Sequence, residues 1–350
     1  MRKETAPPPT RAARALTAEQ RVALFADVPN KPGAPKPDPT LVVDGVSRTF
    51  GGLKAVDVAH LEIQRGCITG LIGPNGAGKT TLFNLLTGFD RPDTGTWSMD
   101  GQSLGKMHPH QVARKGVVRT FQLTKALSKL TVLDNVRLGA TGQRGERILS
   151  TLAPWTWKKQ EREVTERAYQ LLERFKLDAK ADDLAGSMSG GQRKLLEMAR
   201  ALMTDPAVVM LDEPMAGVNP ALTQSLLGHI KSLRDDGMTV VFVEHDMDVI
   251  RDISDWVVVM AQGSVIAEST PEELSNNGAV VDAYLGSHHD QALEFDSDGN
   301  PVGATAVLAE ALQQAEVEEL EAGGDLSEPE FASPTDTSAA VGKHAKGDEK

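Results

Sequence analysis

Residues 73–80 have the sequence Gly73-Pro74-Asn75-Gly76-Ala77-Gly78-Lys79-Thr80 and match the pattern G-x-x-x-x-G-K-[ST] of phosphate-binding loops. The apolar, β-branched run 68–72 before them predicts a buried strand, and residues 81–86 after them have helical spacing. Glycines let backbone N–H groups converge on phosphate oxygens, and a helix N-terminus adds a favourable dipole. The stretch therefore predicts a phosphate site in which Lys79 contacts phosphate and Thr80 offers its hydroxyl to Mg²⁺.

An acidic pair, Asp212-Glu213, follows the apolar run 207–211 and precedes Pro214. A short apolar run between breakers predicts a buried strand of a parallel sheet, and ligands of such sheets bind beyond the carboxyl ends of the strands. Asp212 is thus a candidate ligand of Mg²⁺, directly or through water. Glu213 is a candidate general base for an attacking water. A solvated surface pair is the alternative, and the apolar run and the proline disfavour it.

A third motif, Ser189-Gly190-Gly191-Gln192, lies between the other two and opens a helical stretch. Ser189 is a good N-cap residue, and the glycines leave backbone N–H groups open to an anion. Alone, this motif predicts only the start of a helix. Its position between two nucleotide motifs makes it specific.

The three motifs in this order resemble those of the ABC ATPases. Gln122 in the stretch 119–122 resembles the Q-loop glutamine of that family, which senses Mg²⁺ and water and contacts the membrane partner. His245 resembles the switch histidine that contacts the γ-phosphate, and Phe50 resembles the aromatic residue that stacks on adenine. A phenyl ring in a turn can also simply pack. The resemblance covers residues 39–286.

The resemblance implies ATP and Mg²⁺ as cofactors, with Glu213, His245 and Gln122 as the catalytic residues. It implies Thr80, Gln122 and Asp212 around Mg²⁺. The implied nucleotide contacts are Phe50, Gly73, Pro74, Asn75, Gly76, Ala77, Gly78, Lys79, Thr80, Thr81, Ser189, Gly190, Gly191 and Gln192. In this family Ser189 serves the glycine loop of a second, head-to-tail cassette, so ATP binding closes a pair of cassettes and hydrolysis reopens it.

Within this family the chain is most similar to the importer ATPases for branched-chain, hydrophobic amino acids. Those importers combine two cassette chains, two permease chains and a substrate-binding protein. The second cassette and the permease must here be other chains. One departure is Asn219, which stands where many members have the D-loop Asp and puts the usual contact of that loop across the dimer in doubt. The stretches that carry the similarity are 70–73, 80–89, 119–122, 213–220, 244–248 and 283–286.

Two other functions stay open. One is the ATPase of a different ABC transporter, for urea, amides or envelope lipids. The other is a soluble ABC ATPase of DNA repair, chromosome structure or translation. The chain has one glycine loop and one signature motif, and no room between them for a long coiled coil, which disfavours the soluble ATPases.

The expected fold class is α/β: a P-loop NTPase core with a mostly parallel sheet, an N-terminal antiparallel β subdomain and an inserted α-helical subdomain at about 123–192. Residues 39–286 form the expected ATPase domain. Residues 1–38 are rich in proline and predict a flexible arm, in which 17–25 could form a short helix. Residues 287–350 are acidic and predict a largely disordered tail, apart from a possible amphipathic helix at 304–322.

The net charge of −12 resides in the tail 287–350, because acidic and basic residues balance over the rest of the chain. We therefore expect no nucleic acid partner. No stretch approaches 18 consecutive apolar residues, and the first residues lack the apolar core of a signal peptide. The single cysteine, Cys67, suits plain packing in a reducing compartment. These features predict a protein that stays in the reducing cytosol where it is made. The resemblance to the importer ATPases implies in addition a bacterial protein that is peripheral on the inner face of the cell membrane.

Overall fold

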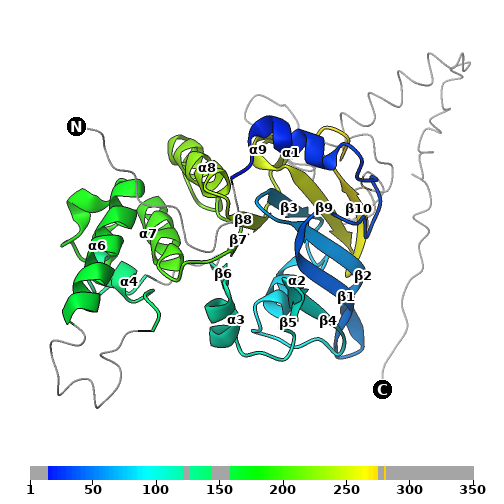
Figure 1. The fold of residues 1–350 in the computed structure, drawn as a ribbon, viewed down its shortest axis with the longest axis horizontal. Coiled ribbons are helices and arrows are strands. Elements are labelled where there is room, and N and C mark those ends of the chain that lie inside the picture. Colours follow the sequence, from blue (N-terminus) through cyan, green and yellow to red (C-terminus); the bar gives the residue numbers. More distant parts are fainter. Residues whose placement is uncertain (1–14, 121–125, 143–157, 275–279, 281–350) are drawn as a thin grey trace, which may run out of the picture. The chain divides into compact units, whose positions relative to one another are not determined.

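The computed structural model describes residues 15–120, 126–142, 158–274 and 280. The chain contains two sheets and a group of helices (Figure 1). The following expectations fall outside the described residues: Gln122, residues 1–14 of the N-terminal arm, the stretch 283–286, the tail 287–350 and the helix expected at 304–322.

The larger sheet has six strands in the order β10-β9-β3-β8-β7-β6. Only β9 and β10 pair antiparallel; the other neighbours are parallel. The central strands are unbroken apolar runs buried on both sides, as parallel sheets require. The strands are β3 (Ile68–Ile72), β6 (Val117–Arg119), β7 (Val208–Asp212), β8 (Thr239–Val243), β9 (Trp256–Ala261) and β10 (Ser264–Ser269).

The smaller sheet is antiparallel, with the order β2-β1-β4-β5. Its first two strands form a hairpin that turns at Gly51 and Gly52, both with positive φ. The alternation of apolar and polar residues in these strands buries one face, as the sequence predicts. The strands are β1 (Pro39–Phe50), β2 (Leu53–Gln64), β4 (Thr94–Met99) and β5 (Gln102–Ser103).

Helices α4, α6 and α7 group together beside the larger sheet (Figure 1). In α6 the apolar stripe Ala168, Leu171 and Leu172 is buried, although the helix as a whole is highly charged. The helices are α1 (Ala18–Phe25), α2 (Lys79–Leu86), α3 (Pro109–Lys115), α4 (Val132–Arg137), α6 (Lys158–Arg174), α7 (Gly190–Leu202), α8 (Pro220–Asp235) and α9 (Met247–Ile253). The predicted α/β class with an antiparallel and a helical part is thus confirmed.

Each face of the larger sheet packs into its own apolar core. Val208, Met210 and Val241 face a core shared with α2 and the antiparallel sheet. Val209 and Leu211, which alternate with them along β7, face a second core shared with α7, α8 and α9. The sheet is therefore covered on both sides, and functional side chains can reach solvent only from its strand ends.

The N-terminal segment differs from the flexible arm that its proline content predicts. Thr17 caps α1, and Phe25 at the end of this helix stacks on Trp256 with ring centroids 4.9 Å apart. Arg21 is buried and lies 3.2 Å from the Asp255 carboxylate. Residues 17–38 are therefore folded against the ATPase domain, because their apolar and charged side chains find partners far along the chain.

Lys36 anchors the end of this segment. Its Nζ lies 2.8 Å from the Glu268 carboxylate, and both side chains are fully buried. The same ammonium lies 4.7 Å from the centre of the Trp256 ring, whose Nε1 donates to Glu268 over 3.1 Å. Removing one partner of such a buried pair leaves an uncompensated charge, which typically costs about 3–5 kcal/mol.

None of the helices in the described parts of the chain is long and apolar enough to cross a membrane. Cys67 is buried directly before β3, and burial raises the pKa of its thiol to about 12. The thiol is therefore protonated at neutral pH, in agreement with a packing role.

Candidate functional site

The glycine loop lies between β3 and α2 and has a backbone that only glycine adopts easily. Gly73 and Gly78 have φ of 146° and 98°. A Cβ at Gly73 would clash with the Met260 carbonyl oxygen, and one at Gly78 would clash with the Ala55 carbonyl oxygen. The motif glycines are thus required by close approach of neighbouring backbone as well as by their own φ.

Lys79 begins α2 and turns its ammonium back into the loop. Its Nζ donates to the carbonyl oxygens of Gly73 over 2.6 Å and Pro74 over 3.0 Å. Burial lowers the pKa of Lys79, and the carboxylates of Glu213 and Asp212 act in the opposite direction. A partly buried cation inside a loop at a helix N-terminus fits a bound phosphate group.

Asp212 lies at the carboxyl end of β7, buried except for 5% of its surface. Its carboxylate pairs with the Arg119 guanidinium at the end of β6. Arg119 also donates to the Asn84 side-chain oxygen of α2 over 2.6 Å. This chain of contacts links Asp212 to the helix that carries Thr80. The Thr80 hydroxyl and the Asp212 carboxylate are oxygen donors of the type that Mg²⁺ prefers.

Glu213 follows Asp212 with a half-buried side chain. Its φ of 45° places it in the left-handed region, which is costly for a residue with a side chain. Its N–H donates to the Val243 carbonyl oxygen of β8 over 3.0 Å. The surrounding structure therefore holds this residue in a conformation that it would not adopt alone.

His245 and Phe50 are both exposed. His245 lies two residues after β8 ends, and its side chain is 73% exposed. Phe50 ends β1, is 47% exposed, and its ring stacks under the Arg48 guanidinium 4.6 Å from the ring centre. Both side chains are accessible to a ligand, as their expected roles require.

The signature motif begins α7 as predicted. The Ser189 hydroxyl accepts from the Gln192 N–H over 3.3 Å, and the Gln192 side chain accepts from the Ser189 N–H over 3.0 Å. Ser189 and Gly190 are exposed, whereas Gly191 is buried against Leu222 of α8. Among the described residues, no hydrogen bond recorded for this motif reaches the glycine loop of the same chain.

Asn219 caps α8, because its side chain accepts from the Leu222 N–H over 2.9 Å. The side chain is thus engaged with its own helix. That Asn219 disturbs the usual contact of this loop across the dimer stays a prediction.

The sequence analysis missed two residues that contact the backbone beyond Glu213. Lys194 lies on α7, and its Nζ donates to the backbone carbonyls of Glu213, Pro214 and Ala216. Glu244 precedes His245 and accepts from the Met215 N–H. A signal was present for Glu244, since a carboxylate directly after the apolar strand 239–243 is unusual. Lys194 had none, because lysine on a helix is normally solvated.

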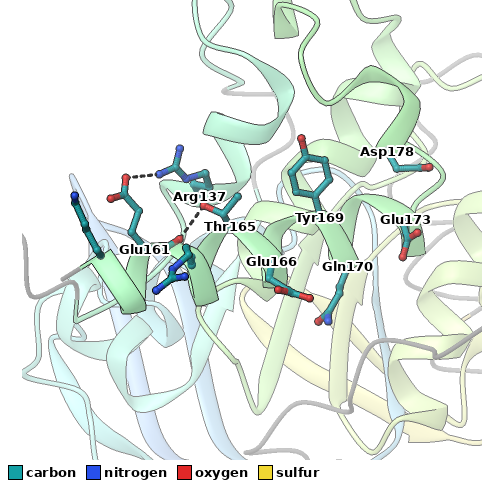
Figure 2. A pocket seen from close by; sticks show the side chains of 10 residues that line it. Arg137, Glu161, Thr165, Glu166, Tyr169, Gln170, Glu173 and Asp178 are labelled. Atoms are coloured by element: carbon teal, nitrogen blue, oxygen red, sulfur yellow. Dashed lines mark hydrogen bonds and ion pairs between the residues drawn. The ribbon is translucent and has the colours of Figure 1, made fainter. Parts of the chain in front are cut away.

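A wide groove on the helical subdomain is separate from these residues. Figure 2 shows charged side chains of both signs along α6, with Arg137 of α4 paired to Glu161 over 2.9 Å. The groove is lined by Arg137, Lys158, Glu161, Arg162, Thr165, Glu166, Tyr169, Gln170, Glu173 and Asp178. Its mixed charge indicates a solvated surface and no preference for an anion or a cation.

The family model of the ABC transporter matches residues 56–216. A probable branched-chain amino acid transport ATP-binding protein, LivG of Archaeoglobus fulgidus, is 43% identical over 247 residues, which cover 71% of this chain and 95% of that protein. The chain belongs to the ATP-binding proteins of ABC transporters. It is accordingly an ATPase whose hydrolysis of ATP is coupled to transport.

Other members support this assignment. The high-affinity branched-chain amino acid transport ATP-binding protein BraF of Pseudomonas aeruginosa is 41% identical over 250 residues, covering 71% of this chain and 98% of that protein. The ADP conformation of MJ1267, an ATP-binding cassette of an ABC transporter, has a TM-score of 0.62 and 36% sequence identity. It covers 71% of this chain and 99% of that chain. The likeness thus includes nearly the complete length of these relatives.

Proposed function

We propose that this ATP-binding protein powers the import of branched-chain, hydrophobic amino acids. The assignment of the ATPase site rests on the position of the candidate residues, which lie beyond the carboxyl ends of β3, β7 and β8. These ends bear the glycine loop with Lys79, the pair Asp212-Glu213, and His245. The substrate class rests on the relatives, which are named branched-chain amino acid transport ATP-binding proteins.

Each candidate residue has a distinct role in this proposal. Lys79 and the N–H groups of residues 73–81 bind the phosphates, and Phe50 stacks on the base. Glu213 accepts a proton from the attacking water, and His245 contacts the γ-phosphate. Gln122 senses the occupied site. Thr80, Asp212 and Gln122 would hold Mg²⁺, which would supply positive charge beside the phosphates.

Ser189, Gly190, Gly191 and Gln192 complete the site of a second cassette in this proposal. The exposed position of Ser189 and Gly190 at the start of α7 supports it, because backbone N–H groups at a helix N-terminus suit an anion. ATP then joins two cassettes, and its hydrolysis releases them.

The closing and opening of the two cassettes drive transmembrane permease chains, with a substrate-binding protein delivering the cargo. The ATPase would lie in the cytoplasm, on the inner face of the cell membrane. The exposed apolar side chains Leu127, Leu138 and Leu184 of the helical subdomain support contact with another protein.

Uptake of labelled leucine tests the substrate class. A strain lacking this gene is expected to lose high-affinity leucine uptake and to recover it with the wild-type chain, but not with the Glu213→Gln variant. Uptake of labelled urea and of a labelled lipid is measured in the same strains. Loss of either of these with unchanged leucine uptake would contradict the amino acid assignment and leave the ATPase assignment standing.

A further inference from the structure

The segment that follows Glu213, residues 213–216, is held by an ammonium group on one side. Lys194 Nζ donates to the carbonyl oxygens of Glu213 over 3.2 Å, Pro214 over 2.8 Å and Ala216 over 2.6 Å. All three N–H groups of a lysine are satisfied by such a set. The charge therefore serves to fix backbone geometry and does not form a surface ion pair.

Lys194 lies on the signature helix α7, five residues after Ser189. Burial lowers the pKa of its ammonium, and the nearby carboxylates of Glu244, Glu197 and Glu213 oppose that effect. A cavity of about 10 Å³ lies beside Lys194, bordered by Asp212 and Pro214. The side chain thus extends from the signature helix to the strand end that carries Asp212 and Glu213.

Glu244 holds the same segment from the other side. Its carboxylate accepts from the Met215 N–H over 2.8 Å, and only 1% of the residue is exposed. Burial raises the pKa of this carboxyl, and the hydrogen bond from Met215 acts against that rise. Its second oxygen lies 3.8 Å from His245 Nδ1. Glu244 therefore connects the backbone after Glu213 to the residue expected to contact the γ-phosphate.

We propose that Lys194 and Glu244 are positioning residues that hold Glu213 in its reactive orientation and tie it to the signature helix. This inference rests on the proposed role of Glu213 as general base. The left-handed conformation of Glu213 supplies the physical reason, since such a conformation persists only where neighbouring contacts over-determine it. Lys194 satisfies the carbonyls on one side of the segment, and Glu244 satisfies an N–H on the other.

The orientation of a general base matters more than its presence nearby. A displacement of about 1 Å can lower a rate by about 100-fold, because the reacting groups leave their near-attack geometry. Residues that act only through Glu213 should therefore change the rate of hydrolysis and leave nucleotide binding unchanged.

The test compares Lys194→Met, which keeps the length of the side chain and removes its donors, with Lys194→Arg, which keeps charge and donors. Both are assembled into the complete transporter, with the surface variant Lys231→Met as the matched control. Lys194→Met is expected to lower kcat for ATP about 10- to 100-fold, with KM and ATP affinity unchanged, and Lys194→Arg to recover part of the loss. Glu244→Leu should behave like Lys194→Met, and Glu244→Gln, which keeps an acceptor oxygen, should retain more activity.

A structural role would give a different pattern. Loss of kcat that only follows a loss of folded protein, or a raised KM with unchanged kcat, would overturn the proposal. Single-turnover hydrolysis in the Glu213→Gln background separates the inference from the proposed base. In the Glu213→Gln background we expect Lys194→Met to lower the hydrolysis rate no further. A double variant whose loss equals the product of the two single losses would refute the inference.

The rates of the two variants also separate the role of Glu213 as general base from the role of Lys194 as positioning residue. If Glu213→Gln loses ATP hydrolysis as expected but Lys194→Met hydrolyses ATP at the wild-type rate, only the positioning role is overturned. Wild-type rates in Glu213→Gln would overturn the base and, with it, any residue acting through that base.

Discussion

Glu213→Gln is expected to lower the rate of ATP hydrolysis by about 10²- to 10⁴-fold, the usual contribution of a general base. The amide has nearly the shape of the carboxylate but cannot accept the proton of the attacking water. ATP binding should persist, because the glycine loop and Lys79 are unchanged. The measurement is phosphate release by the purified transporter, together with ATP affinity of the isolated chain.

The matched control is Glu163→Gln, on the exposed side of α6, where the carboxylate lies 3.8 Å from Lys159. It should keep the wild-type rate. We also expect Glu213→Gln to accumulate the closed pair of cassettes with ATP, since hydrolysis no longer releases it. A Glu213→Gln variant that hydrolyses ATP at nearly the wild-type rate would show that another residue is the base.

Lys79→Ala is expected to weaken ATP binding by about 10- to 100-fold. The variant loses hydrogen bonds to a charged group, each contributing about 1.5–3 kcal/mol. The change should appear as loss of the thermal stabilisation that ATP gives to the isolated chain. Lys180→Ala, which removes an exposed lysine beside Asp183, is the control for a general effect of charge.

Stability without nucleotide must be measured for the same variant. Lys79 also bonds the carbonyls of Gly73 and Pro74, so its removal can loosen the empty loop. If Lys79→Ala keeps both its fold and the wild-type affinity for ATP, the assignment of the glycine loop as the phosphate site is incorrect.

The sheet could be predicted from the sequence because its strands are unbroken apolar runs between breakers. The apolar run 207–211 predicts a strand, and β7 lies within one residue of these bounds. The apolar runs 239–243 and 256–260 are of the same kind and form β8 and β9. The glycine loop and the capped start of α7 at Ser189 were predictable for the same reason, since each depends on local backbone chemistry.

The short helix expected at 17–25 is present as α1 (Ala18–Phe25), but the packing of the N-terminal segment could not be predicted, because its contacts are distant in sequence. Lys36 pairs with Glu268 and Phe25 stacks on Trp256, more than 200 residues away in both cases. Proline content reports only local stiffness, so it favoured a flexible arm. Tertiary partners outweighed that local preference.

The supports of the candidate site were hidden from the sequence for a related reason. Lys194 and Glu244 contact backbone atoms of residues 213–216, and backbone atoms carry no sequence signal. Only the meeting of α7, β7 and β8 brings the two side chains to this segment. The sequence motifs therefore identify the residues expected to contact the nucleotide, whereas only the fold identifies the residues that position them.

The central claim is that each cassette contributes to two ATP sites. Its glycine loop binds one nucleotide, and its Ser189 contacts the nucleotide held by the other cassette. Ser189→Arg tests it most directly, with Ser103→Arg on the exposed strand β5 as the control for an added arginine. The measurements are ATP affinity of the isolated chain and ATP hydrolysis by the assembled transporter. We predict unchanged affinity and lost hydrolysis; affinity lost in the isolated chain, or hydrolysis unchanged in the transporter, would contradict the claim.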